Sequence, residues 1–188
     1  MTVEALPLPD PPLADAVVAL RPWGRADAPA IAAAYGDPEI LRFSWPHARG
    51  YTIEDAHAYL AESARLRTAG RALELAVTAV DRSQEPLGVV SLYDVDRDQD
   101  RGWLGYWVTP AARGRGIATR AARLLAQWGF DALGLARIEL TCGPDNATSQ
   151  RVAERCGFTR EGQLRSHIRF KGGRRDTVVF GLLPGELR

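Results

Sequence analysis

Apolar residues recur along this 188-residue chain with two different spacings. Short runs that are continuously apolar, or that alternate apolar and polar residues, are typical of β-strands, whereas apolar residues three and four positions apart are typical of helices. The strand-like runs are residues 16–20, 73–80, 87–93, 104–108, 137–142, 159–170 and 176–183. The helix-like runs start near residues 27, 52, 117 and 146 and extend to about residues 35, 68, 133 and 157. This order predicts an α/β (α+β) fold with flanking helices and a mixed, mostly antiparallel sheet of about six or seven strands.

Capping and turn residues divide the chain further: Asp27 is a candidate cap of the first helix, and residues 81–86 are predicted to be a polar turn between two strands. Thr52 and Asp55 form a capping-box pattern at the start of one predicted helix. Four prolines among small residues predict a flexible, Pro-rich leader over residues 1–15, because such a segment has little apolar surface to bury. The remaining sequence contains no internal repeat and no linker, so residues 16–188 are predicted to form a single domain.

A glycine-rich turn at residues 113–116 carries the most informative chemistry. The apolar strand before it runs to Val108 and is ended by Pro110, which cannot donate to a strand ladder, and an amphipathic helix follows from Ile117. Main-chain N–H groups at such a helix start favour a bound phosphate or pyrophosphate. The sequence matches neither the nucleoside-triphosphate loop nor the dinucleotide fingerprint. The alternative is a turn whose arginines only solvate a helix end.

A second informative stretch starts at Asn146 and ends at Phe158. Asn146 and Ser149 are three positions apart at a predicted helix start, so their side chains share a face and can contact one ligand. The same two residues also fit a plain N-cap that satisfies the first backbone donors. Both interpretations stay open from the residues alone.

The charge balance excludes some classes of partner. The chain has 24 Lys and Arg residues against 23 Asp and Glu residues, a net charge of +1, which gives no general attraction to nucleic acid or to an anionic membrane. The arginines near the glycine turn do not alternate with aromatic residues, which also disfavours a nucleic-acid interface.

The cysteines and the apolar runs indicate in which cellular compartment the protein is expected. Cys142 and Cys156 have no metal-ligand spacing and are expected to be buried thiols, so no metal is predicted. No apolar run reaches the roughly 18 residues of a membrane span, and the N-terminus lacks the pattern of a signal peptide. These features predict a cytoplasmic protein.

The turn Arg113-x-x-Gly116-x-Ala118 resembles the acyl-CoA pyrophosphate motif, Gln/Arg-x-x-Gly-x-Gly/Ala, of the GNAT N-acetyltransferase family. The stretch from Asn146 to Phe158 starts 30 positions after Gly116 and is similar to the ribosomal-protein alanine N-acetyltransferase (RimJ/RimL-type) branch. Shorter fragments agree with that branch: Asp37-Pro38-Glu39, Tyr51 to Asp55, Gly105-Tyr106-Trp107, Glu161-Gly162 and Arg175-Asp176. The resemblance covers about residues 16–185.

This resemblance implies that the chain binds acetyl-CoA. Main-chain N–H groups from Arg113 to Thr119 would hold the pyrophosphate, and the strand edge at Trp107 and Val108 would pair with the pantetheine arm. The implied contacts are Trp107, Val108, Arg113, Gly114, Arg115, Gly116, Ile117, Ala118, Thr119, Asn146 and Ser149. The Val108 N–H would lie near the developing oxyanion. Arg113, Arg115 and Arg120 are candidates to contact the phosphates through charge-assisted hydrogen bonds. At least one of the three is expected to be a solvated arginine instead.

The resemblance also implies catalytic roles. Many family members protonate the leaving thiolate with a tyrosine on the helix that starts near Asn146, but no tyrosine follows Tyr106 in this chain. Ser149 stands where the branch carries a serine thought to act as the acid. Glu139 matches a glutamate that deprotonates the amine, directly or through water; a structural strand residue paired with Arg137 is the alternative.

Several positions depart from the family pattern. Ile168 stands where some relatives carry a second glutamate, with His167 beside it, and Trp103 replaces an acidic residue, which predicts a more aromatic acceptor pocket. Aromatic and histidine candidates for that pocket, most of them expected in the core, are Phe43, Trp45, His47, Tyr93 and Trp103.

The implied function is an N-acetyltransferase that moves the acetyl group of acetyl-CoA to a primary amine by direct attack in a ternary complex. The acceptor is a protein N-terminus, an amino acid or a small-molecule amine. A non-catalytic acyl-CoA-binding sensor or partner protein is the alternative, because the usual tyrosine is missing and the base is unsettled. No nucleic acid and no membrane is expected as a partner, and a homodimer fits the branch.

Overall fold

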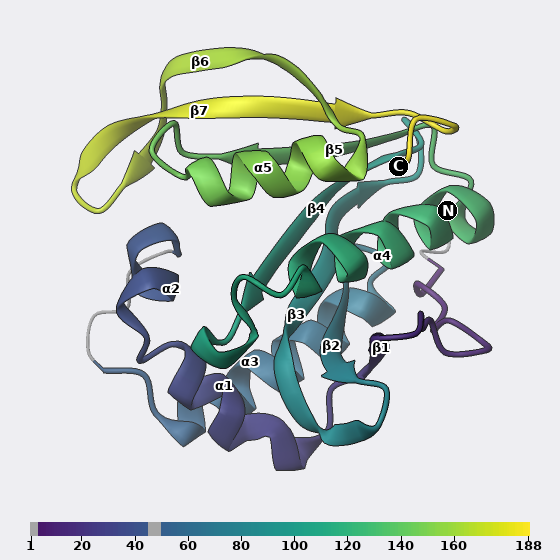
Figure 1. Ribbon diagram of the computed structural model, residues 1–188, viewed down its shortest axis with the longest axis vertical. Helices are drawn as coiled ribbons and strands as arrows, with labels where there is room; N and C mark the ends of the chain where they lie inside the picture. Colours follow the sequence, from purple (N-terminus) through teal and green to yellow (C-terminus); the bar gives the residue numbers. More distant parts are fainter. Residues whose placement is uncertain (1–3, 45–49) are drawn as a thin grey trace.

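The structure, a computed structural model, describes residues 4–44 and 50–188. Across these residues seven strands form one sheet in the order β1-β2-β3-β4-β5-β7-β6 (Figure 1). The strands are β1 (Val18–Pro22), β2 (Leu73–Ala79), β3 (Arg82–Asp96), β4 (Arg101–Val108), β5 (Arg137–Cys142), β6 (Thr159–Phe170) and β7 (Gly173–Leu182). Strands β4 and β5 pair in parallel, and the other neighbours pair antiparallel. The predicted mixed, mostly antiparallel sheet is confirmed.

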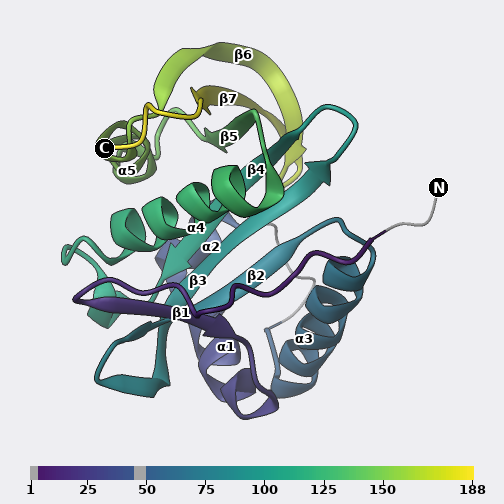
Figure 2. The ribbon, with the colours of Figure 1, turned by 90° about the vertical axis from the view of Figure 1, so that its right-hand side faces the viewer.

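The helices cover both faces of this sheet. They are α1 (Ala28–Ala34), α2 (Pro38–Phe43), α3 (Ile53–Thr68), α4 (Ile117–Leu133) and α5 (Ala147–Cys156), with short 3-10 turns at Arg25–Asp27 and Pro110–Ala112. Figure 2 shows α4 on one side of strands β1 to β4 and α1 and α3 on the other. Helix α5 packs against β5, β6 and α4.

The main core lies between α4 and the sheet. Strand β2 contributes the alternate residues Leu73, Leu75 and Val77, and α4 contributes Ile117 and Leu125 from one face of the helix. This pattern follows from the two periodicities, because a strand presents every second residue and a helix every third or fourth to the same neighbour. The core therefore fixes the position of the α4 N-terminus relative to β4.

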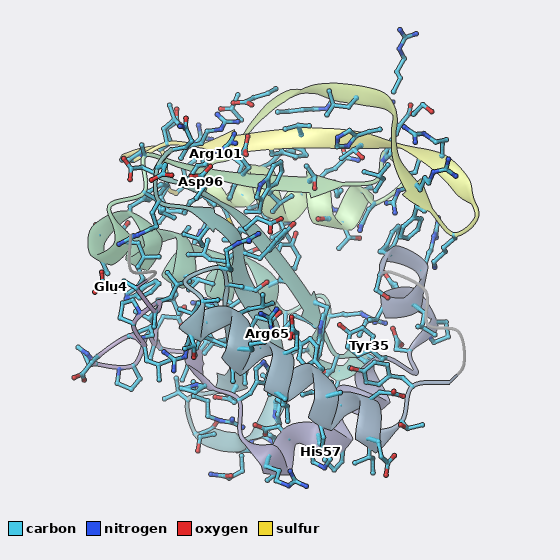
Figure 3. The ribbon with its side chains drawn as sticks, turned by 180° about the vertical axis from the view of Figure 1, so that it is seen from behind. Glu4, Tyr35, His57, Arg65, Asp96 and Arg101 are labelled. Carbon is cyan, nitrogen blue, oxygen red and sulfur yellow. The ribbon has the colours of Figure 1, made fainter. Side chains whose placement is uncertain are left out.

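A smaller cluster of Ala28, Ile31 and Ala56 joins α1 to α3 on the opposite face. Figure 3 shows this side of the molecule, with Tyr35 beside α3, which carries His57 and Arg65. The capping box predicted at the start of α3 is confirmed, with reciprocal hydrogen bonds between its first and fourth residues.

Residues 4–15, which the sequence assigns to the leader, lie along the domain. The Leu6 side chain is only 2% exposed and belongs to the main core. Its N–H donates to the Arg67 carbonyl at 2.9 Å, and Ala14 forms a bridge with Ala19. At least one residue of this segment therefore contributes buried apolar area to the domain.

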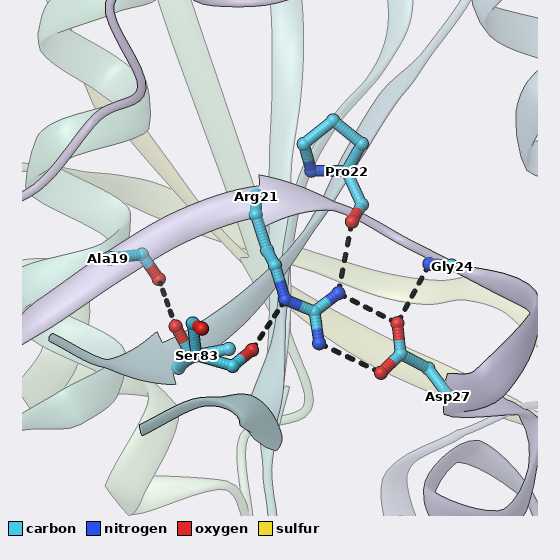
Figure 4. A network of polar contacts seen from close by, with 7 residues as sticks. Ala19, Arg21, Pro22, Gly24, Asp27 and Ser83 are labelled. Atoms are coloured by element: carbon cyan, nitrogen blue, oxygen red, sulfur yellow. Dashed lines mark hydrogen bonds and ion pairs between the residues drawn. The ribbon is translucent and has the colours of Figure 1, made fainter. Parts of the chain in front are cut away.

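Asp27 precedes α1, as the sequence predicts, but its side chain makes no cap hydrogen bond there. Its two carboxylate oxygens instead accept from both terminal nitrogens of Arg21, at 2.7 and 2.8 Å (Figure 4). The Gly24 N–H adds a third hydrogen bond at 2.8 Å. This network ties the end of β1 to the start of α1.

The polar segment 81–86, predicted as a turn, belongs largely to β3. Pro86 pairs with Thr78 at a point where the ladder between β2 and β3 shifts register. A proline has no N–H to donate, so the irregularity accommodates it within the strand. The strand prediction starting at residue 87 was therefore too short.

The feature that positions the site is the separation of β4 from β5. Their parallel ladder covers only Arg101–Trp103 and Arg137–Glu139. Strand β4 continues to pair with β3 as far as Val108, and β5 continues to pair with β7 as far as Cys142. In the described residues, β4 and β5 thus diverge and leave one edge of β4 open (Figure 1).

Candidate active site

Two cavities open where β4 and β5 diverge. One of about 500 Å³ is lined from β4, β5 and the β6–β7 hairpin, and we call it the hairpin cavity. The other, of about 250 Å³, is lined from α2, β4 and the starts of α4 and α5, and we call it the helix cavity. The described residues that line both are Phe43, Tyr106, Asn146 and Ser149. These four residues mark the junction of the two cavities.

The open edge of β4 offers main-chain groups to a ligand. The Thr109 N–H donates to the Leu87 carbonyl of β3 at 2.8 Å. Because hydrogen bonding alternates along an antiparallel strand, every second residue of β4 before Thr109 also has its N–H and carbonyl directed to β3. Trp107 belongs to that set, although it also lines the helix cavity. The N–H groups of Tyr106 and Val108 therefore point into the gap.

The glycine turn presents a row of unpaired donors. In the described part of the chain, no main-chain carbonyl and no capping side chain accepts from the N–H groups between Gly114 and Thr119. The first backbone bond of α4 runs from Arg120 to Gly116, at 3.1 Å. Gly114 and Gly116 have φ values of 71° and 75°, the left-handed region that glycine adopts without a Cβ penalty. This geometry suits an anion with several oxygens.

The three arginines near this turn differ in their partners. The Arg113 guanidinium is paired with the Asp37 carboxylate and lies 3.4 Å from Glu39, so it holds the N-terminus of α2. Arg120 donates to Asp15 at 2.8 Å. Arg115 is exposed and makes only a 3.4 Å contact with a backbone carbonyl. Of the three, Arg115 is therefore the arginine whose charge is least neutralised by a carboxylate among the described residues.

Asn146 and Ser149 lie at the start of α5, beside the gap. The Asn146 Oδ1 accepts from the Ser149 N–H at 3.1 Å, which is the plain N-cap interpretation. Both side chains also line both cavities, which is the ligand-binding interpretation. The two interpretations are compatible, because the cap uses only the carbonyl oxygen of the asparagine amide.

Tyr106 is a site residue that the sequence analysis did not assign. Its hydroxyl lies 2.9 Å from the Ser149 Oγ and 3.3 Å from the Ser149 carbonyl. Burial raises the pKa of Tyr106 well above its usual value, so the phenol stays protonated. Alternation along β4 was the signal that could have found it, because Tyr106 shares a face with Leu104 and Val108.

Cys142 ends β5 and lines the hairpin cavity. Burial raises the pKa of its thiol, and a hydrogen bond with Ser149 opposes that rise. Cys156 is fully buried, as predicted, while Cys142 is half-buried.

Glu139 lies on β5 in a pairing with Arg137. Its Oε1 accepts from the Arg137 Nε at 3.0 Å, while its buried Oε2 has no partner among the described residues. The carboxylate lines neither cavity. Arg137 also pairs with Glu161, at 2.5 Å. The structural pairing that the sequence left open as an alternative is therefore present.

The hairpin cavity has aromatic walls, from Phe43, Tyr93, Trp103, Tyr106 and Phe170. His167 and Ile168, the two residues at the position of the missing second glutamate, also line it. Trp45 and His47, the other candidates for an acceptor pocket, lie outside the described residues.

A sheet whose parallel central strands separate beside an uncapped glycine turn is the architecture of a coenzyme A-dependent acyltransferase. Residues 18–159 match the family model described as "Acetyltransferase (GNAT) domain", and the chain belongs to the GNAT acetyltransferase family.

Its relatives include acetyltransferases of several kinds. The chain is 37% identical over 98 residues, 52% of its length, to the Bacillus subtilis protein named "Probable N-acetyltransferase YjcK". It is 28% identical over 99 residues, 53% of its length, to spermidine N(1)-acetyltransferase of Escherichia coli K12. The matched stretches span about half of these relatives, 54% and 53% of their lengths.

A solved structure, RimJ of Mycobacterium smegmatis in complex with CoA-disulfide, is similar over most of the chain. The TM-score is 0.84 at 27% identity, with 94% of this chain and 87% of that chain covered. This similarity supports the predicted RimJ/RimL-type resemblance.

The described residues also bear on metal ions and membranes. No three His, Cys, Asp or Glu side chains gather within residues 4–44 and 50–188 in a way that would hold a metal ion. None of the helices formed by those residues is long and apolar enough to cross a bilayer.

Proposed function

We propose that this protein transfers the acetyl group of acetyl-CoA to a primary amine in a ternary complex. The observation that carries the proposal is the row of unpaired N–H groups from Gly114 to Thr119 beside the open edge of β4. The turn would hold the pyrophosphate of CoA, and the main chain of Tyr106 and Val108 would pair with the pantetheine amides. The helix cavity then receives the pantetheine and the hairpin cavity the acceptor.

Acetyl-CoA supplies a thioester whose acyl carbon reacts with the amine and whose thiolate leaves. From the wall of the helix cavity, the Val108 N–H would donate to the carbonyl oxygen as negative charge develops on it. One donor of this kind typically lowers a barrier by about 3 kcal/mol. Binding both reactants in adjoining cavities also removes the cost of bringing them together.

Ser149 is the proposed general acid. Its Oγ lies at the cavity junction, and the Tyr106 hydroxyl at 2.9 Å can return a proton to it or orient it. A thiolate is a good leaving group, so a weak acid is sufficient.

The proton of the amine has two candidate acceptors. Glu139 would act through water with its Oε2, which has no partner among the described residues, and the His167 imidazole lies on the wall of the hairpin cavity. Glu139→Gln and His167→Gln separate them. The substitution that removes the base should remove the fall in kcat/KM at low pH, because that fall reports protonation of the base. The other substitution should leave the fall in place.

The acceptor class remains part of the proposal: a protein N-terminus, an amino acid or a small-molecule amine. Spermidine enters as a candidate because one relative is named for acetylating it. A cytoplasmic location and a homodimer are also proposals, which fit the two free thiols and the RimJ/RimL-type resemblance.

The test is incubation of the purified protein with acetyl-CoA and a panel of primary amines, followed by release of free thiol. Amine-dependent thiol release supports the proposal. Tight binding of CoA with no turnover on any amine would instead establish the non-catalytic acyl-CoA-binding protein. Absence of measurable affinity for CoA would contradict both.

A further inference from the structure

The guanidinium of Arg175 lies in the hairpin cavity and has few hydrogen-bonding or ionic partners. Its side chain is 18% exposed, and the nearest carboxylate oxygen, on Asp145, is 3.8 Å away, beyond hydrogen-bond distance. Asp145 is already paired with Arg42 at 3.0 Å. Within residues 4–44 and 50–188, no group accepts a hydrogen bond from the Arg175 guanidinium, although it carries five N–H donors.

The guanidinium is held in place by its surroundings. Its central carbon lies 4.5 Å from the ring centroid of Phe170 and 5.9 Å from that of Phe43. Gly143 lies directly against it, because a Cβ built on Gly143 would be 1.7 Å from an Arg175 terminal nitrogen. Stacking on an aromatic face and a glycine in contact fix the plane of the fork before any ligand arrives.

A second unpaired donor lies two positions further along β7. Thr177 lines the hairpin cavity and is 4% exposed, and its buried Oγ1 has no partner among the described residues. Residues two apart on a strand share a face, so Arg175 and Thr177 present their donors to the same space. Unsatisfied buried donors are uncommon and call for an acceptor.

The charges of the hairpin beside this cavity are predominantly positive. Residues 159–176 carry six Arg and Lys residues against two acidic ones. The carboxylate that lines the cavity is that of Asp94, which is paired with Arg71 at 3.3 Å. A guanidinium fork, a hydroxyl and a positive local field together suit a carboxylate, which accepts two parallel hydrogen bonds from arginine.

We propose that the acceptor is a primary amine that also carries a carboxylate, and that Arg175, with Thr177, binds this carboxylate in the hairpin cavity. The proposal rests on the proposed acetyltransferase function and names its substrate class. It assigns Arg175 to specificity, apart from the acyl-transfer groups at the cavity junction. A polycation such as spermidine would meet the positive charge of the Arg175 guanidinium and is disfavoured.

The test compares acceptors that differ only in one carboxylate placed away from the amine, so that the amine itself is unchanged. One pair is alanyl-alanine and its C-terminal amide; the other is alanyl-aspartate and alanyl-asparagine, both as amides. In at least one pair the carboxylate member should have a kcat/KM about tenfold to a hundredfold higher, the range of a charge-assisted hydrogen-bonded pair. Equal rates within both pairs, or faster acetylation of spermidine, would overturn the proposal.

The variants locate the effect. Arg175→Gln should abolish the preference without changing CoA affinity, and Arg175→Lys should keep part of it, because lysine retains the charge without the fork. Gly143→Ala should also abolish it with the arginine still present, since the added methyl displaces the guanidinium. Arg169→Gln, an exposed residue of the same hairpin, is the matched control for the loss of one charge. A preference that survives in both Arg175→Gln and Gly143→Ala would contradict the assignment.

Binding separates this proposal from the proposed function. If CoA binds but no amine is acetylated, the catalytic function fails, and calorimetry of the same pairs with the CoA-bound protein still decides the acceptor class. Tighter binding of the carboxylate member, lost in Arg175→Gln, supports the inference. Equal affinity within each pair, or no binding of either member, refutes it.

Discussion

The hydroxyl of Tyr106 lies 2.9 Å from the Oγ of Ser149 and joins β4 to α5 across the gap between β4 and β5. Neither residue is near the other in sequence, and α5 packs on β5 and β6, across the gap from the end of β4. Because burial raises the pKa of Tyr106, the phenol keeps its proton and holds the serine at the junction of the two cavities. In the proposed mechanism, these two hydroxyl groups together would replace the acid function of a family tyrosine.

Ser149→Ala should lower kcat by about tenfold or more while the Kd of CoA changes little, because the hydroxyl acts on the leaving thiolate and not on the pyrophosphate. Tyr106→Phe, the matched variant, keeps Ser149 and should cause a smaller loss. Steady-state rates and CoA titration measure both. A Ser149→Ala enzyme with unchanged kcat would remove serine from the mechanism.

Gly116→Ala should weaken CoA binding about tenfold, because a residue with a Cβ resists the φ of 75° that aims the N–H groups at the anion. Gly172→Ala is the control: Gly172 has a φ of 81° but lies in the turn between β6 and β7. Its substitution should cost similar stability and leave the Kd of CoA unchanged. Equal losses of CoA affinity in the two variants would mean that backbone strain alone explains the effect.

Cys142 should react with iodoacetamide more slowly than free cysteine at pH 8, because burial raises the pKa of its thiol and leaves little thiolate. Added CoA should change this rate little, because the pantetheine is proposed to lie in the helix cavity, whereas Cys142 lines only the hairpin cavity. Mass spectrometry of the labelled protein, with Cys142→Ser as control, reports the site. Strong protection by CoA would place the thiol inside the CoA site, and rapid labelling would contradict the raised pKa of Cys142.

Asp27→Asn should lower the free energy of unfolding at pH 7 by about 2 kcal/mol, because it breaks a largely buried, bidentate ion pair. Burial by itself would raise the pKa of Asp27, but hydrogen bonds from Arg21 and Gly24 outweigh it and hold the pKa below its usual range. The stabilisation is therefore complete above the unfolded pKa of about 3.9 and is lost as the pH falls through the lower folded pKa.

Urea unfolding of both proteins at pH 7 and at pH 2 to 3 checks this sign. The difference between wild type and Asp27→Asn should shrink at the acid end. The exposed Asp98→Asn serves as the control and should show no such difference at pH 7. An Asp27→Asn penalty that grows at low pH would reverse the assignment.

Local signals in the sequence predicted most of the secondary structure. The predicted strand 137–142 and the helix that begins at Ile117 match β5 and the start of α4, because each is bounded by residues with strong backbone preferences. Segment 81–86 was mispredicted as a turn, because its strand character comes from pairing with β2. The side chain of Asp27 behaved differently from a cap because Arg21, on another element, competes for it.

The sequence by itself determined the GNAT resemblance, the glycine turn and the place of Ser149, because spacing within a single turn or helix fixes which groups can act together. The tertiary structure decided the partners: Arg113 with Asp37, Tyr106 with Ser149, and Arg175 against Gly143. These pairs join residues from different elements, and their contacts exist only once the packing of helices on a diverging sheet brings distant segments together. Which charges remain free for a ligand therefore depends on the fold.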